Sequence, residues 1–274
     1  MTDEPAATRR AGGRQARRKA RAAPLDKAAR PVRAGLHGGQ YRPLTQAQLH
    51  DILEAALTAL ETIGLADAPA SGIEAMCGAG AILGADGRLR FPRAVVEAAL
   101  EMAARDVTLC GRDPAHDLHL APGRVHYGTA GAAVYMVDLE GRAYRESTLR
   151  DLSDAARIAD QLDNIHFFQR PMICRDITDN REMDLNTLYA SCAGTLKHVG
   201  TSFSDPAYVA DAVALLHLIA GGEAAWRARP FASCSICFVV PPMKFATEAC
   251  ETLEACVAAG MPVLLLSAGQ SGAT

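Results

Sequence analysis

The sequence predicts an α/β protein that carries part of a (β/α)8 barrel behind a segment of helices and antiparallel strands. Four apolar stretches typical of buried strands begin near residues 165, 198, 232 and 263, with a helical pattern between them. Their spacing of about 30 to 35 residues is the period of such a barrel, whose eight units need about 250 residues. Polar side chains follow the ends of these stretches, where parallel strands carry their chemistry. We therefore expect about four β/α units, the first half of a barrel.

Three segments follow from this pattern: a basic disordered tail over residues 1–36, a helical and β-hairpin segment over 37–147, and the truncated half barrel over 148–274. The first 33 residues carry eight Arg and two Lys against three acidic residues, with few large apolar side chains. Such a composition cannot form a packed core. It also lacks aromatic residues that could stack on bases, so we expect no nucleic-acid partner.

Composition and cysteine usage place the chain among ordinary globular proteins. Hydrophobic residues make up 49% of the sequence and charged residues 22%. The eight cysteines lie mostly within apolar runs, without the dense spacing of a disulfide scaffold. Reduced thiols of this kind indicate a cytoplasmic protein. No apolar run reaches the length of a membrane span, so we expect no membrane partner.

The N-terminal segment should begin with helices. Thr45 and Gln48 have the spacing of a capping box, and an apolar stripe follows until Gly64. This pattern predicts a helix over 45–63. Shorter helical patterns cover 69–76 and, after Pro92, about 92–104.

Apolar residues then recur with a period of two between residues 107 and 145. The expected strands cover 107–109, 118–120, 125–127, 132–137 and 143–144. Turns at Pro122-Gly123 and Glu140-Gly141 separate them, so we expect an antiparallel sheet.

The barrel part should begin at Thr148, which caps a helix that ends near 162. The expected strands cover 165–168, 197–203, 231–238 and 263–266, and the helices between them cover 184–194, 207–220 and 245–258. Because helices connect them, we expect all four strands to be parallel.

Polar residues at the strand ends form the first candidate site. They are Gln169, Arg170, Thr201, Ser202, Ser267 and Gln270. Two interpretations remain open: these residues cap loops, or they line the mouth of a catalytic barrel.

Four other patterns have structural interpretations. Gly78-x-Gly80 lies between a helix and a turn, so it does not fit a dinucleotide fingerprint. Cys234 and Cys237 point to opposite faces of a strand and are expected in the core. The histidines of the β segment favour surface roles over a metal site: His116, His119 and His126. For the acids that surround a helix start, general acid chemistry and dipole complementation remain equally open: Asp176, Asp179, Glu182 and Asp184.

Several long stretches resemble the trimethylamine methyltransferase family. They are GGQYRPLT at 38–45, TAGAAVYMVD at 129–138, CRDITDNREMDLNTLYA at 174–190, KHVGTSFSDPAYV at 197–209, CFVVPPMKFA at 237–246 and GMPVLLLSAGQSGAT at 260–274. The resemblance covers nearly all of the chain outside the basic tail and corresponds to the N-terminal half of the family's TIM barrel.

This resemblance implies a methyltransferase that moves a methyl group from a methylated amine to the cobalt of a corrinoid. The corrinoid (cobalamin) is supplied by a partner protein and is not bound directly, and the full-length enzyme is expected to form homo-oligomers. Some members contain pyrrolysine and act on trimethylamine, whereas others are associated with quaternary amines such as glycine betaine. The position that separates them lies beyond Thr274. A second interpretation is a truncated, inactive remnant or binding module of the same fold.

The chemistry of such substrates suggests binding residues, although no catalytic residue can be assigned in this half. A quaternary ammonium prefers aromatic faces, which Phe203 and Phe238 offer. A substrate carboxylate prefers Arg, which Arg170 or Arg175 offers. No resident metal is expected, because the cobalt belongs to the partner.

Overall fold

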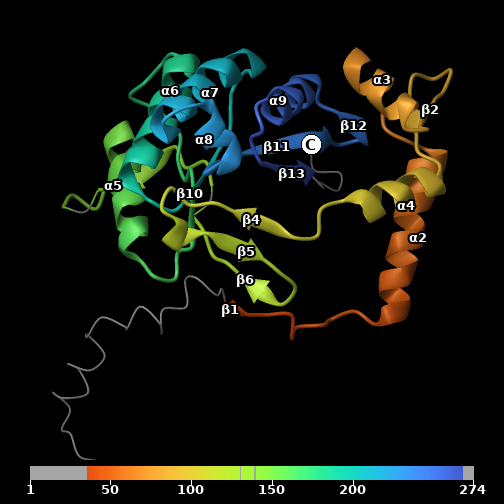
Figure 1. Ribbon diagram of the computed structural model, residues 1–274, viewed down its shortest axis with the longest axis horizontal. Coiled ribbons are helices and arrows are strands. Elements are labelled where there is room, and N and C mark those ends of the chain that lie inside the picture. The colour runs from red at the N-terminus through yellow and green to blue at the C-terminus, as the bar shows by residue number, and fades with distance from the viewer. Residues whose placement is uncertain (1–35, 130, 139, 268–274) are drawn as a thin grey trace, which may run out of the picture.

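A parallel sheet forms the centre of the structure, a computed structural model that describes residues 36–129, 131–138 and 140–267 (Figure 1). Its strands are β9 (Phe167–Gln169), β10 (His198–Thr201), β11 (Ala232–Val240) and β13 (Val263–Ser267). Each is parallel to the next and lies beside it in chain order. The predicted parallel order of the four strands is confirmed.

Two further parallel bridges, at residues 128 and 133, extend the sheet beside β9 and the loop that follows it. Gly128 pairs with Phe167 and Ala133 with Met172, both in parallel orientation. The backbone N–H of Ala133 donates to the Pro171 carbonyl at 3.1 Å. The sequence did not predict this pairing, because the segment over residues 127–133 is rich in small residues and has no apolar run that marks a buried strand.

Helices cover one face of the sheet, which we call the helix face. They are α5 (Leu149–Gln161), α6 (Asn180–Gly194), α7 (Val209–Ala220), α8 (Glu223–Ala228) and α9 (Thr247–Ala258). Val199, Cys234 and Ile236 of the strands pack against Leu188 and Leu216 of the helices. These contacts remove the apolar side chains of the strands from water, which supplies the main stabilisation of the layer.

Local signals set the helix boundaries. Thr148 and Asp151 form a capping box at the start of α5, and Asp179 caps α6 by accepting the Glu182 N–H at 2.8 Å. Helix α7 ends at Gly221, whose φ of 87° is the left-handed conformation that glycine adopts without strain. The predicted caps at residues 45 and 148 are confirmed.

The N-terminal helices form a separate group beyond the carboxyl end of β11, at the right of Figure 1. They are α2 (Gln46–Thr62), α3 (Ala70–Gly78) and α4 (Arg93–Met102), with the hairpin β2 (Ile82–Leu83) and β3 (Leu89–Arg90) between the last two. Ala66 joins this group to β12 (Lys244–Phe245), since its carbonyl accepts the Phe245 N–H at 2.8 Å.

The expected antiparallel sheet over 107–145 is wrong in its connectivity. Three separate pairs form instead: β4 (Val107–Leu109) with β5 (Leu118–Leu120), β7 (Tyr135–Val137) with β8 (Tyr144–Glu146), and β1 (Leu36–His37) with β6 (Arg124–Val125). Period-two patterning identified most of these strands but not their partners. In the segment between β6 and β7, Gly128 and Ala133 pair instead with Phe167 and Met172 in parallel orientation.

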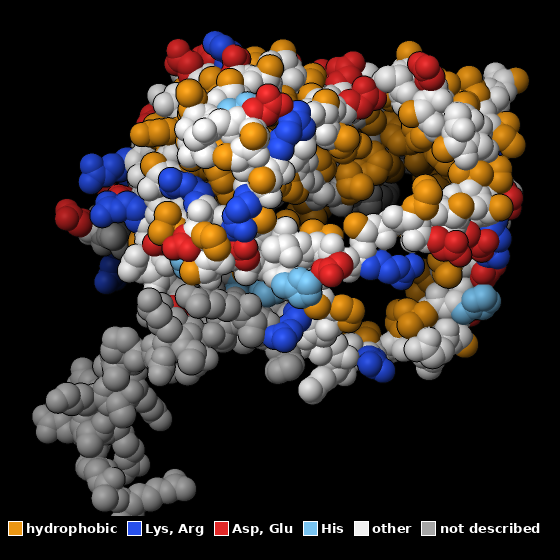
Figure 2. All heavy atoms as spheres, in the orientation of Figure 1, with side chains coloured by type: hydrophobic (Ala, Val, Ile, Leu, Met, Phe, Trp, Pro, Cys, Tyr) orange, Lys and Arg blue, Asp and Glu red, His pale blue; other side chains and the backbone are white. Residues whose placement is uncertain are grey.

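The inner face of the sheet, opposite the helices, is only partly covered. The β4–β5 hairpin lies beneath it, and Figure 2 shows hydrophobic side chains around a hollow between this hairpin and the region of α9. On β13 the side chains of Leu264, Leu265 and Leu266 are 53%, 55% and 42% exposed. The sheet does not close into a barrel within residues 36–267. No helix of the described ranges is long and apolar enough to span a membrane.

Candidate functional site at the carboxyl edge of the sheet

The carboxyl ends of residues 127–133, β9 and β10 meet at one edge of the sheet, which we call the carboxyl edge. The loop over residues 171–179 follows β9, and the loop over residues 202–205 follows β10. The sequence predicts that the site residues lie together at this edge. In the structure they lie in several different places.

Gln169 lies on the inner face at the end of β9. It pairs with Gly200 of β10, and its Oε1 lies 3.4 Å from the Ser235 hydroxyl of β11. A Cβ on Gly200 would collide with the Gln169 side chain, so the glycine allows this amide to cross the sheet. The backbone carbonyl of Gln169 accepts the Thr129 hydroxyl at 2.6 Å. Sequence reasoning missed Thr129 and Gly200, although both lie in the stretches that resemble the family.

Arg170 lies in a buried polar cluster between β9, α6 and the loop after β10. Its Nη1 is 3.1 Å from Asp184 Oδ1, and its Nη2 donates to the Ser202 hydroxyl at 2.7 Å. The Asp184 side chain is fully buried, and its Oδ2 accepts the Ser204 N–H at 2.7 Å. Arg170 is therefore already paired with a carboxylate of its own chain.

Two further acids of this region, Asp176 and Asp179, bind backbone groups at helix starts. Asp179 caps α6, and Glu182 lies in the first turn of that helix. Asp176 accepts the Leu149 N–H at 3.0 Å, at the start of α5. These contacts favour the dipole-complementing interpretation for Asp176 and Asp179.

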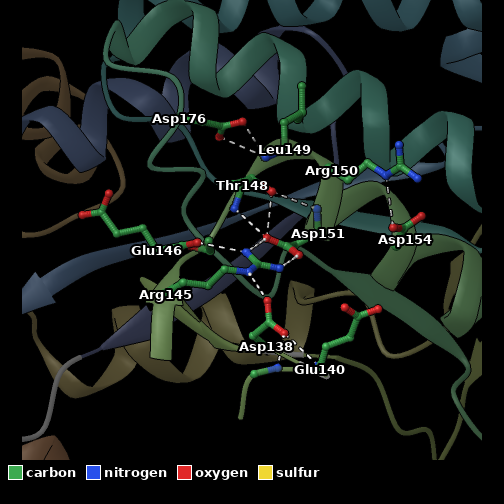
Figure 3. Close-up of polar contacts among 12 residues, drawn as sticks. Asp138, Glu140, Arg145, Glu146, Thr148, Leu149, Arg150, Asp151, Asp154 and Asp176 are labelled. Atoms are coloured by element: carbon green, nitrogen blue, oxygen red, sulfur yellow. Dashed lines mark hydrogen bonds and ion pairs between the residues drawn. The ribbon is translucent and has the colours of Figure 1, made fainter. Parts of the chain in front are cut away.

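The β7–β8 hairpin is fixed at the carboxyl edge through Arg145 (Figure 3). Its Nη1 and Nη2 donate to the two carboxylate oxygens of Asp151 at 2.7 and 2.6 Å, and Asp138 lies 3.7 Å from its Nε. The Arg145 guanidinium holds the pKa of Asp151 well below its usual range. Since Asp151 also caps α5, the bidentate pair ties the hairpin to the first turn of this helix.

Arg175 borders a cavity of about 490 Å³ at the carboxyl edge. Its Nε lies 3.6 Å from Glu146 Oε1, and half of its side chain is exposed. An ion pair between two side chains this exposed is weak, so it does not preclude binding of an anion by Arg175. The walls of the cavity come from β8, the loop after β9, the start of α6 and the loop after β10: Glu146, Ile173, Arg175, Thr178, Asn180 and Ser204.

The other predicted residues do not join Arg175. Thr201 pairs with Cys234 and is buried on the helix face, and Phe203 packs against the core of that face. Phe238 packs toward the N-terminal helices, with its ring 6.4 Å from that of Phe245. Ser267 ends β13, and Gln270 lies outside the described residues.

A second cavity, of about 450 Å³, lies between the inner face and the β4–β5 hairpin. Its walls are mainly apolar. Phe167 and His198 border it at the amino ends of their strands, and the predicted site residue Gln169 borders it at the end of β9. Chemistry in parallel α/β folds is placed at the carboxyl ends of the strands. This general rule favours the carboxyl edge as the candidate site.

His198 is buried in the neutral form at this inner cavity. Its Nδ1 lies 2.8 Å from the Cys110 carbonyl, which can only accept, so Nδ1 carries the proton and Nε2 accepts from the Ser233 hydroxyl at 2.9 Å. Burial lowers the pKa of His198 to about 4.

We expect this histidine to make the stability depend on pH. As the pH falls, the unfolded chain, with a histidine pKa near 6.5, binds a proton before the folded chain does. The free energy of unfolding should therefore decrease by about 3 kcal/mol between pH 6.5 and 4. Urea unfolding at several pH values, followed by the fluorescence of the single tryptophan, measures the loss. His198→Gln should remove this component, and His50→Gln, at an exposed position, should retain it. An identical pH profile for His198→Gln and the wild type would show that the assignment is wrong.

The other sequence motifs have structural roles. Gly78 ends α3, and Gly80 has a φ of 107° in the turn that follows. Cys234 is buried in the core, while Cys237 is only partly buried. His119 lies 3.3 Å from Asp106. Among the residues with assigned positions, no group of three His, Cys, Asp or Glu side chains could hold a metal ion.

Comparisons with known proteins agree with the resemblance of the sequence. A family model described as trimethylamine methyltransferase (MTTB) matches residues 10–274. The trimethylamine methyltransferase MttB of Desulfitobacterium hafniense is 30% identical over 248 residues, which cover 88% of this chain and 48% of that protein. One of the trimethylamine methyltransferases of Methanosarcina mazei is 28% identical over 190 residues, which cover 67% of this chain and 38% of that protein.

The chain thus spans about half, or less, of the length of these relatives. The match of the family model extends over nearly the whole sequence. The chain belongs to the trimethylamine methyltransferase family.

Proposed function

We propose that the protein takes part in methyl transfer from a methylated amine to the cobalt of a corrinoid carried by a separate protein. Membership of the family is the observation that carries this proposal, since its relatives are named for trimethylamine methyl transfer. The parallel order of β9, β10, β11 and β13 supports a barrel wall whose carboxyl edge is the mouth. In this proposal the described residues form the N-terminal part of the barrel.

The described residues would contribute by positioning the amine. When bound in the partner, the corrinoid supplies the nucleophile, so this chain need not supply one. The methyl carbon leaves the amine nitrogen, which keeps the electron pair of the broken C–N bond. The chain must hold the C–N bond in line with the acceptor and exclude water, and rates of such steps depend strongly on placement.

Two substrate classes fit different observations. The names of the relatives favour trimethylamine. Arg175 at the edge of the cavity favours an amine that also carries a carboxylate, such as glycine betaine, because guanidinium groups bind carboxylates in bidentate fashion. The Arg170 guanidinium is a weaker candidate for binding a substrate carboxylate, since it already forms an ion pair with Asp184.

The test is formation of the methyl–cobalt bond, followed by its visible absorbance. The protein at the full length of its family is incubated with a reduced corrinoid protein and either trimethylamine or glycine betaine. A Methanosarcina relative with trimethylamine checks that the partner is competent. We expect transfer from one of the two amines. If neither of these amines, nor any of a broad panel of methylated amines, donates a methyl group to the competent partner, the proposal is wrong, and the binding-module interpretation takes its place.

A further inference from the structure

We propose that the Arg170–Asp184 ion pair is a positioning device for the loop over residues 202–205, and that it sets the shape of the cavity at the carboxyl edge. The catalytic consequence rests on the proposed function, whereas the structural part stands on the contacts alone. This role differs from those that the sequence suggests, which are anion binding for Arg170 and acid chemistry for Asp184.

The contacts of the pair lead to the same loop from two directions. Arg170 Nη2 donates to the Ser202 hydroxyl at 2.7 Å, and the Ser204 N–H donates to Asp184 Oδ2 at 2.7 Å. The two charged groups bind each other at 3.1 Å through Nη1 and Oδ1. Each end of the loop is thus attached to a different member of one ion pair.

The pair also connects elements that are distant in sequence. Arg170 follows β9, and its N–H donates to the Gly200 carbonyl of β10 at 2.9 Å. Asp184 lies in α6, one turn after the helix start. A shift of the helix relative to the strand would therefore move the loop.

Because the pair is buried, it contributes more to the placement of the groups that it binds than to stability. The side chain of Asp184 is 0% exposed and that of Arg170 is 12% exposed. A buried ion pair is a poor source of stability, because desolvation offsets the attraction, and apolar replacements of both partners are often tolerated. Its directional hydrogen bonds, by contrast, fix the groups that they reach.

The loop that the pair holds borders the cavity. Ser204 is one of the residues that line the cavity beside Arg175. Phe203, between the two attachment points, packs into the core of the helix face. Loss of the pair would free the polar side of the loop while Phe203 still anchors it, so the cavity wall would move without unfolding of the chain.

The experiment compares two double variants of the full chain by hydrogen exchange. Arg170→Met with Asp184→Leu removes both charges and leaves neither partner unpaired. The control is Arg229→Met with Asp117→Leu, an ion pair of 2.7 Å at the amino end of β11. Exchange of the Ser204 amide is measured together with the thermal midpoint.

We expect the Ser204 amide of the Arg170–Asp184 variant to exchange at least about tenfold faster, with a thermal midpoint within about 4 °C of the wild type. The control should leave this amide unchanged. Unchanged exchange at Ser204 in the Arg170–Asp184 variant overturns the proposal. A thermal midpoint that falls much further, with faster exchange throughout the chain, also overturns it, because the pair is then a general stabilising contact.

The methyl-transfer assay adds a catalytic readout. At saturating amine, kcat of the Arg170–Asp184 variant should fall by about tenfold or more, and that of the control should stay within about twofold. An unchanged kcat contradicts a positioning role. Absence of transfer by the wild-type protein would count against the proposed function only, since hydrogen exchange still decides the role of the pair.

Discussion

Replacement of Lys197 with methionine should lower the free energy of unfolding by about 3 kcal/mol or more. The side chain is 1% exposed, and its Nζ donates to three backbone carbonyls, those of Ala159, Leu162 and Ile165, at 2.6 to 2.7 Å. Burial lowers the pKa of Lys197, and the nearby carboxylates of Asp160 and Asp163 oppose this shift. Methionine fills the space but removes the charged donor of all three carbonyls, and those of Ala159 and Leu162 keep only backbone N–H donors at 3.3 and 3.1 Å.

Urea unfolding monitored by tryptophan fluorescence measures the change. Lys244→Met is the matched control, because Lys244 is 43% exposed and its ion pair with Asp67 spans 3.5 Å. An exposed pair of this kind contributes less than about 1 kcal/mol. Equal effects of the two substitutions would contradict the role of Lys197 as a buried helix cap.

Trp226→Ala should destabilise the protein by about 3 to 5 kcal/mol, the usual cost of removing a buried aromatic side chain. Trp226 is completely buried in α8, its indole N–H donates to the Ala259 carbonyl at 3.0 Å, and its ring meets that of Phe231 edge-on at 5.4 Å. The substitution would leave a large cavity between α8 and β11.

Circular dichroism measures this change, because the variant loses the only tryptophan of the sequence. Trp226→Phe is the control: it retains an aromatic ring and loses the hydrogen bond, so about 1 to 2 kcal/mol is expected. A cost for Trp226→Ala below about 1 kcal/mol would show that α8 is not part of the core.

The elements with strong local signals were predicted from the sequence. The capping residues Thr45 and Thr148 start helices as expected, and the apolar runs of β9, β10, β11 and β13 form parallel strands. Helix α8 has six residues, too few for a clear period, and β12 has two. Gly128 pairs with Phe167 of β9, and Ala133 pairs with Met172 of the loop that follows. Backbone groups make these bridges, so no pattern of side chains predicts them.

The candidate site was predicted less well, for a physical reason. The sequence places residues at strand ends, but it does not show whether another side chain already occupies them. Arg170 appeared available for a substrate carboxylate, and the structure pairs it with Asp184. Thr201 ends β10 and Phe203 follows it, as predicted, but both side chains face the helices. Arg175 borders the cavity at the carboxyl edge, and its role in substrate binding stays a prediction.

The most direct test of function at the carboxyl edge compares matched obstructions of the two cavities. Thr178→Trp fills the cavity beside Arg175, and Leu120→Trp fills the cavity beneath the inner face. Both positions are exposed enough to accept the larger side chain without unfolding. In the proposed methyl-transfer assay with a competent corrinoid partner, Thr178→Trp should lower kcat/KM by about tenfold or more, and Leu120→Trp should leave it within about twofold. The opposite result, loss with Leu120→Trp and full activity with Thr178→Trp, would place the site at the inner face and contradict the assignment.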